Sequence, residues 1–257
     1  MIDPLYSLSG FVVGAIVGIT GVRGGSLMTP LLILLFGIHP ATAVGTDLLF
    51  AAATKTAGSA VHGFNKVIAW DVVGLLAAGS VPGAAITLWI LSQGDPMSDD
   101  TARWISLVLG AMLVVTALTI LFRERLLGLA RAAPEKSPLQ SAIITVAFGA
   151  AIGVLVSISS IGAGAVGVTV LMMTYPRMPL LRVVATDIAH AVPLTLVAGM
   201  GHWAIGNVDW VMLVSLLVGS IPGIVIASLF APKLPEKAVG WALGTILVIV
   251  GVKLVVS

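Results

Sequence analysis

The stretch that decides the fold is GFVVGAIVGITGVRGGSLMTP, residues 10–30. It begins as an apolar helix with regularly spaced glycines, is interrupted around a single arginine, Arg23, and restarts with Ser26, Thr29 and Pro30, which favour helix starts. Unpaired backbone groups are costly in an apolar medium, so such a break is tolerated only where protein or a wet cavity satisfies them. The stretch therefore predicts a binding site for a small anion inside a membrane.

The composition places the chain among membrane proteins. Of 257 residues, 58% are hydrophobic and 9% are charged, whereas a soluble domain carries about 25% charged residues. Apolar runs near the length of a membrane span recur throughout, so we expect an all-α polytopic membrane protein. The absence of cysteine excludes disulfide and thiol chemistry. The few charges favour no nucleic-acid partner, and the first residues lack the basic region of a signal peptide.

One long polar stretch divides the apolar segments into two groups. The segments fall near 6–38, 41–63, 70–92, 103–122, 139–174, 180–205, 208–230 and 237–256. We therefore expect an N-terminal transmembrane repeat over 1–122, a polar cytoplasmic linker over 123–138 and a C-terminal transmembrane repeat over 139–257.

The two groups of segments repeat each other. Glycines and prolines recur at an offset of 139, and a second set recurs at 140 after one inserted residue. The matched residues are Gly10 and Gly149, Gly14 and Gly153, Gly25 and Gly164, Pro40 and Pro179, Thr46–Asp47 and Thr186–Asp187, His62 and His202, Trp70 and Trp210, and the pentapeptides at 79–83 and 219–223. Because rare residues match at one offset, the pattern predicts two homologous halves.

The relative direction of the halves depends on the first segment of each. Residues 6–38 and 139–174 would each reach about 45–50 Å as one helix, against a hydrocarbon core of about 30 Å. Each is either one long broken span, which gives a parallel repeat, or a re-entrant hairpin, which gives an inverted repeat. With the basic linker in the cytoplasm, the re-entrant arrangement also places Arg177 and Arg182 inside. The charges thus favour an inverted repeat, an architecture of transporters.

Both breaks are candidate sites because a helix start offers N–H groups and a partial positive charge. The substrate-binding candidates there are Gly24, Gly25 and Ser26 in the first break and Ser159, Ser160 and Gly162 in the second. The alternative is that small residues only let helices pack closely, and we favour it for the earlier glycines of each segment.

Five charged or titratable residues complete the candidate set. Arg23 either binds substrate oxygens in a fork or reaches the interface or Asp47. Asp47 and Asp187 either cap their helices or carry a coupling proton. Lys55 follows Asp47 by eight positions on the same helix face, which favours an interior cationic role. His190 either shares a proton or is a hydrogen-bonded core residue.

Other features are expected to be structural. The histidines and tryptophans at 62, 70, 202 and 210 are typical of interfacial anchors. The chain has no Walker loop, dinucleotide fingerprint, zinc-protease motif or nucleophile elbow. We therefore expect no enzyme, no metal and no cofactor.

The glycine run at 14–25, followed by Pro30, Gly37, Pro40, Ala43 and Thr46, resembles the TauE/SafE family of sulfite and organosulfonate exporters. The resemblance extends over essentially the whole chain. It implies a multi-pass permease of the bacterial inner membrane for small sulfur-containing anions such as sulfite or sulfoacetate, with proton-driven transport. The chain departs from the family pattern in the Val22–Arg23 pair of the first break and in lacking a double glycine in the second, where selectivity would lie.

The leading hypothesis is a proton-coupled exporter with alternating access between the two repeats and a site between their breaks. The alternatives are a channel or cation permease that uses the intramembrane aspartates, and an intramembrane enzyme that uses His190 or His62 with a serine. The expected partners are a small anion and the lipid bilayer; a homodimer stays open.

Overall fold

The computed structural model describes residues 4–20, 27–64, 67–132, 134, 136–162, 164–230 and 235–256. Within these residues the chain forms α-helices joined by short connections. The helices are α1 (Pro4–Thr20), α2 (Met28–Phe36), α3 (Pro40–Phe64), α4 (Trp70–Gln93), α5 (Asp99–Leu121), α6 (Arg123–Ala132), α7 (Pro138–Ser159), α8 (Ala165–Thr174), α9 (Leu180–Ala204), α10 (Trp210–Phe230) and α11 (Glu236–Val256). The expectation of an all-α chain is confirmed.

The helix ends follow local sequence signals. The side chain of Ser137 accepts from the backbone of Gln140 at the start of α7, and the Gln140 side chain accepts from the backbone of Ser137 in return. At the start of α5 the Ser98 side chain accepts from the Thr101 backbone N–H. Gly37 ends α2 with a φ of 63°, a left-handed conformation that glycine adopts without steric cost.

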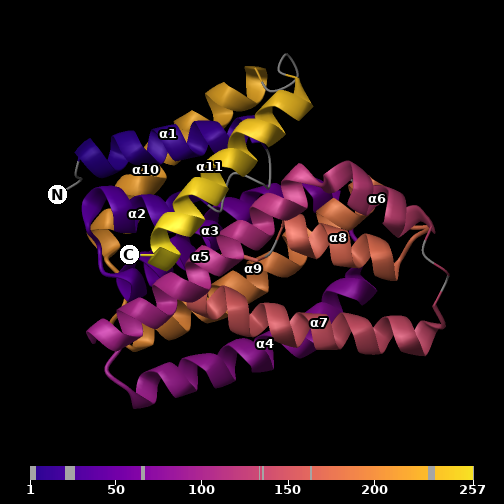
Figure 1. Ribbon diagram of the computed structural model, residues 1–257, viewed down its shortest axis with the longest axis horizontal. Helices are drawn as coiled ribbons and strands as arrows, with labels where there is room; N and C mark the ends of the chain where they lie inside the picture. Colours follow the sequence, from indigo (N-terminus) through magenta and orange to yellow (C-terminus); the bar gives the residue numbers. More distant parts are fainter. Residues whose placement is uncertain are drawn as a thin grey trace.

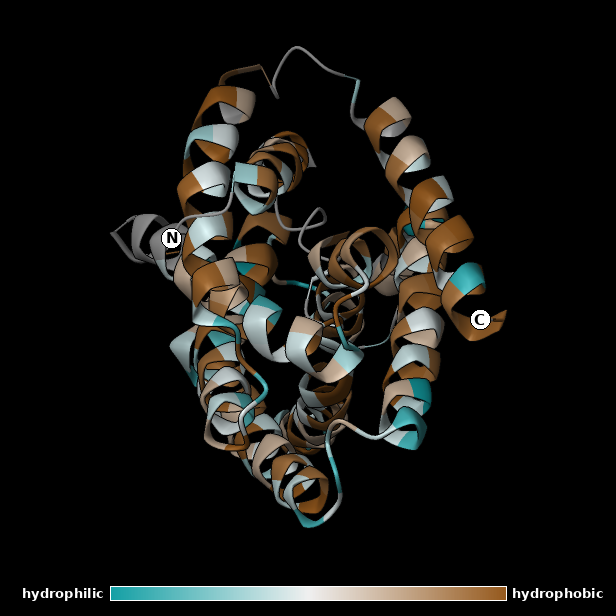
Figure 2. Ribbon diagram, turned by 90° about the vertical axis from the view of Figure 1, so that its left-hand side faces the viewer, coloured by the Kyte–Doolittle hydropathy of each residue, from teal (hydrophilic) through white to brown (hydrophobic). Residues whose placement is uncertain are grey.

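The helices are suited to a lipid environment. Six helices in the described part of the chain are long and apolar enough to cross a membrane: α4, α5, α7, α9, α10 and α11. Figure 2 shows hydrophobic residues along most of the helical surface and hydrophilic residues in short patches. Large apolar side chains such as Trp89, Ile221 and Ile249 point outward. Because lipid tails solvate such surfaces, the chain is a polytopic membrane protein.

Helices from the first and second halves of the sequence pack in pairs. α1 lies along α10, α4 along α7, α3 along α9, and α5 along α11 (Figure 1). In the first two pairs the backbones approach so closely that a Cβ on Gly14 would meet the carbonyl oxygen of Ser220, and a Cβ on Gly153 that of Ser80. Small residues allow this close crossing, as is common in membrane helices.

The contacts of one crossing recur at the matching positions of the other. Gly10 meets Leu216 and Gly149 meets Leu76, while Gly219 meets Ser7 and Gly79 meets Val146. These partners differ by the sequence offsets of 139 and 140. The matching contacts are what a duplication predicts; the inverted direction of the halves stays a prediction.

The C-terminal end of α8 lies beside the N-terminal part of α7. The Lys136 ammonium, just before α7, donates to the Met173 carbonyl oxygen near the end of α8 at 2.6 Å. The hydroxyl groups of Thr145 on α7 and Tyr175 after α8 lie 2.9 Å apart. The segment 139–174 is therefore not one long span but a helix that breaks and turns back.

The structure adds detail to one expectation outside the site and corrects another. The polar stretch over 123–138 contains a helix, α6, which packs against α8, and its role as a cytoplasmic linker stays a prediction. His202 is fully buried, with Nε2 at 2.8 Å from the Ser157 carbonyl oxygen, and so is not an interfacial anchor. Trp70 and Trp210 are largely exposed, as expected of anchors. The side chain of His62 lies outside the described part of the chain.

Candidate functional site

The candidate site lies where α3 and α9 pack together in the middle of the helix bundle. α3 carries Asp47 and Lys55, and α9 carries Asp187 and His190. Asp47, Asp187 and His190 are each at most 3% exposed. Charged side chains so deep in an apolar chain are rare and mark functional sites by default.

The side chain of Asp47, on α3, lies against the first turn of α2. The Thr29 hydroxyl donates to Asp47 Oδ2 in a short hydrogen bond, and the Thr29 backbone N–H is directed at the same carboxylate. Ser160 Oγ, from the second break, faces this carboxylate too, but it makes no hydrogen bond of ordinary geometry. The first turn of α2 thus presents two donors of Thr29 to Asp47, while the expected candidates at 24–26 lie outside the described residues.

The side chain of Asp187, on α9, lies against the start of α8 in the matching way. The Gly164 backbone N–H is directed at its carboxylate, and Oδ1 lies so close to Gly167 that any Cβ there would collide with it. Oδ2 is buried and accepts no hydrogen bond from the described residues. Since an unpaired buried oxygen is costly, this atom is a point where a proton or another donor would be stabilising.

Lys55 brings a positive charge to both carboxylates. It lies within electrostatic reach of Asp47 and of Asp187. Neither carboxylate forms a direct ion pair with it in the described part of the chain, so the ammonium stands back from each. The positive charge of Lys55 therefore acts on two carboxylates, one from each half of the chain.

His190 extends the cluster toward α4. Its Nε2 lies 2.8 Å from Ser80 Oγ, and both side chains are buried. Lys55 is within electrostatic reach of His190 as well. Ser80 is also the residue whose backbone carbonyl faces Gly153 in the α4–α7 crossing, so the cluster touches that crossing directly.

Two threonines beside the aspartates tie each site helix to the other half. Thr46 Oγ1 accepts from the Asp209 backbone N–H at 3.1 Å, and Thr186 Oγ1 accepts from the Ala69 backbone N–H at 3.0 Å. Asp209 and Ala69 are themselves 140 positions apart. The two hydrogen bonds are therefore matched, and each anchors the helix that carries an aspartate.

The second break is only partly arranged as expected. The Ser159 hydroxyl is bonded to its own segment, through the carbonyl oxygens of Leu155 and Ile161. Gly162, with a φ of 137°, faces the apolar side chains of Met112 and Ile152, so both residues serve the turn. Ser160, which ends α7 with a φ of 58°, is the residue of this group that reaches the cluster.

Four candidates of the first break, Arg23, Gly24, Gly25 and Ser26, lie outside the described residues. The described part of the site is the set Asp47, Lys55, Ser160, Asp187 and His190. Sequence reasoning did not identify Ser80 or Gly167 as members. Ser80 carried a signal, since it stands in a repeated pentapeptide, whereas Gly167 has no counterpart glycine.

Comparison with known proteins places the chain among membrane transporters. Residues 6–254 match the model of the family described as sulfite exporter TauE/SafE. A protein of Bacillus subtilis (strain 168), "Probable membrane transporter protein YjnA", is 36% identical over 96% of this chain and 98% of its own length. A second from the same strain, "Probable membrane transporter protein YdhB", is 30% identical over 88% of this chain and 89% of its own. No solved structure matches the chain.

Proposed function

We propose that this chain, which belongs to the sulfite exporter TauE/SafE family, is a secondary transporter of a small sulfur-containing anion such as sulfite or an organosulfonate. The family and its relatives are membrane transporters, not enzymes, and the chain acts in a lipid bilayer on a small substrate. We propose that transport takes place across the cell (inner) membrane and is coupled to protons. Because the anion and the proton move in the same direction in the scheme below, export requires an outward gradient of the anion that exceeds the inward gradient of protons.

The observation that carries the proposal is the cluster at the α3–α9 contact. Two buried carboxylates, Asp47 and Asp187, each lie against the start of a short helix, and Lys55 acts on both. A helix start and an ammonium are both preferred partners of an oxyanion. A carboxylate in this position competes with an anionic substrate for the helix start and for the ammonium of Lys55.

This competition provides a route to proton coupling. When ionised, two carboxylates and one ammonium leave the cluster with one negative charge in excess. A proton on either carboxylate makes the cluster neutral and frees its donors for a substrate anion. Release of the proton restores the repulsion and favours release of the anion. Anion and proton would therefore bind and leave together.

The close helix crossings indicate which parts move in alternating access. The α1–α10 and α4–α7 pairs each join the two halves through backbone contacts that leave no room for sliding. We therefore expect these pairs to rotate as bodies around the α3–α9 contact. A simple rocking of residues 1–122 against residues 139–257 would have to separate both pairs. Repeats of inverted direction would give the two end states equivalent geometries.

A cation permease remains the competing function, because two buried carboxylates can coordinate a cation. The position of Lys55 argues against it, since its charge would repel a cation bound to Asp47 or Asp187. Flux of the two ion types therefore separates the hypotheses.

The test is flux through the purified chain in proteoliposomes. We expect inward proton gradients to drive uptake of labelled sulfite, and Lys55→Met to lower the initial rate by about tenfold or more, the factor for one charge-assisted hydrogen bond. Lys253→Met is the matched control, because Lys253 is exposed in the last turn of α11. Flux of sodium or potassium that Asp47→Asn abolishes, without flux of sulfite, would overturn the proposal.

A further inference from the structure

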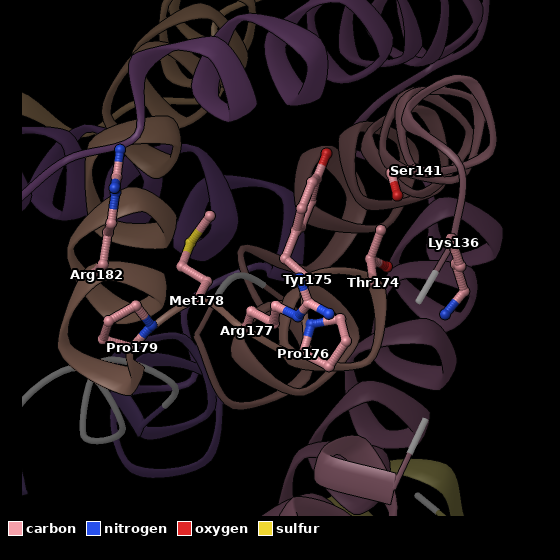
Figure 3. Close-up of a pocket in the computed structure, with 9 residues that line it drawn as sticks. All are labelled: Lys136, Ser141, Thr174, Tyr175, Pro176, Arg177, Met178, Pro179 and Arg182. Carbon is pink, nitrogen blue, oxygen red and sulfur yellow. The ribbon is translucent and has the colours of Figure 1, made fainter. Parts of the chain in front are cut away.

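A second polar site lies at the C-terminal end of α8, away from the cluster of Asp47, Lys55, Ser160, Asp187 and His190. A pocket of about 330 Å³ is formed by the start of α7 with Lys136 just before it, the end of α8, the connection from α8 to α9 and the first turn of α9 (Figure 3). Its polar lining consists of Lys136, Arg177 and Arg182 together with the hydroxyl groups of Ser141, Thr174 and Tyr175. No acidic side chain is among the described residues that line it.

The three cations lie along the pocket, each from a different part of the chain that forms it. Figure 3 shows Arg177 between Lys136 and Arg182, which come from three different parts of the chain. Lys136 uses one of its three N–H donors on the Met173 carbonyl oxygen, which fixes its ammonium at the pocket. Arg177 and Arg182 are both exposed; an incoming anion can reach Arg182, while Arg177 already has an interaction within the protein that an anion would have to share or replace.

The pocket is joined to the cluster by two helices. Arg182 precedes Asp187 by five positions on α9, a rise of about 7.5 Å. Thr174 ends α8, the helix whose start faces Asp187 through Gly164. The pocket is therefore linked to Asp187 by about 7.5 Å of α9 and by the full length of α8, about 15 Å.

The first half has no equivalent charges. At the repeat offset Arg177 corresponds to Ile38, and Arg182 corresponds to Thr42 or Ala43. The basic pocket is thus a feature of one end of the molecule, whereas the aspartates are shared. This asymmetry fits a role in loading from one side.

We propose that this pocket binds a tetrahedral or pyramidal oxyanion group. The group is supplied either by the free substrate anion on its way to the cluster or by the phosphate of an anionic lipid. Arginine forks and an ammonium match the charge and geometry of such oxygens, and basic pockets near the membrane surface suit lipid headgroups. The substrate role rests on the proposed function, whereas the binding itself does not.

The test is the thermal stability of the purified full chain in neutral detergent. One arm titrates sodium sulfite or sodium sulfate against sodium chloride at equal ionic strength; the other compares phosphatidylglycerol with phosphatidylcholine in mixed micelles. We expect stabilisation whose half-saturating concentration rises about tenfold in Arg177→Gln/Arg182→Gln. It should be unchanged in Arg103→Gln, an exposed charge on α5. Stabilisation in the first arm indicates the free anion as the source, and stabilisation in the second arm alone indicates lipid.

A central-site variant separates this inference from the proposed function. Stabilisation that persists in Lys55→Met but is lost in the double arginine variant supports the pocket even if no sulfite is transported. Stabilisation lost in Lys55→Met but kept in the double variant would place the anion only at the cluster, and overturn the pocket. No stabilisation in either arm would also overturn it. In flux assays the double variant should raise the KM for sulfite about tenfold with an unchanged maximal rate.

Discussion

The Thr29 hydroxyl donates a hydrogen bond to the Asp47 carboxylate, and so joins the first turn of α2 to the N-terminal part of α3. The bond is buried, and both residues are almost fully inaccessible. It shows that the helix start after the first break is already matched to an anion, one that belongs to the protein. The account of coupling depends on this arrangement, since a substrate must compete with a resident carboxylate.

Loss of this bond should weaken both the fold and the site. We expect Thr29→Val to lower the free energy of unfolding by about 1–3 kcal/mol, because the buried carboxylate loses a donor. Thermal unfolding in detergent measures the change. Thr119→Val is the control, because the Thr119 hydroxyl bonds only to a carbonyl of its own helix. Equal losses in the two variants would contradict the role of Thr29.

The α4–α7 crossing should tolerate no side chain at Gly79. A Cβ there would meet the Val146 carbonyl oxygen, which is backbone and cannot rotate away. We expect Gly79→Ala to lower the thermal midpoint strongly or to prevent assembly. Gly74→Ala on the same helix has open space around its Cβ and should be neutral or slightly stabilising. A Gly79→Ala protein as stable as Gly74→Ala would contradict the close crossing.

The hydrogen bonds accepted by Thr46 and Thr186 should contribute similar amounts to the free energy of unfolding. Thr186→Val removes the acceptor of the Ala69 backbone N–H, and Thr46→Val removes that of Asp209. We expect each variant to lose about 1–3 kcal/mol of unfolding free energy, as for an unpaired polar group. Thr119→Val again provides the baseline. A loss in only one of the two variants would mean that the anchoring differs between the halves.

His190 and Ser80 should behave as one unit. We expect His190→Gln and Ser80→Ala each to slow sulfite flux, and the double variant to be no slower than the worse single variant, because both remove the same 2.8 Å contact. Initial rates in proteoliposomes provide the comparison. Strictly multiplicative losses would show that the two residues act separately.

Much of the architecture could be predicted because membrane spans are encoded in local composition. The serine-rich break correctly separates α7 from α8, whereas the predicted break at 21–25, between α1 and α2, lies outside the described residues. The cross-half pairing of α1 with α10 was not predicted, although its cause is visible in the glycines at 10, 14, 219 and 223. Small residues indicate that a helix packs closely, but they do not identify its partner.

The candidate site could be predicted in part for a similar reason. Charges in apolar segments identified Asp47, Lys55 and Asp187, which the fold brings to one cluster. The binding role of Ser159 stays a prediction, and in the structure its hydroxyl bonds to its own turn. Serines bond readily to nearby backbone, and sequence alone does not decide between that and a ligand.

The central claim is that a buried aspartate couples anion movement to protons, and Asp187 is where it is tested most directly. The measurement is sulfite uptake into proteoliposomes with and without an inward proton gradient, for the unmodified chain and for Asp187→Asn. We predict that the gradient accelerates uptake by the unmodified chain, whereas Asp187→Asn retains sulfite exchange at equal pH but does not respond to the gradient. A gradient response in Asp187→Asn equal to that of the unmodified chain would contradict the account.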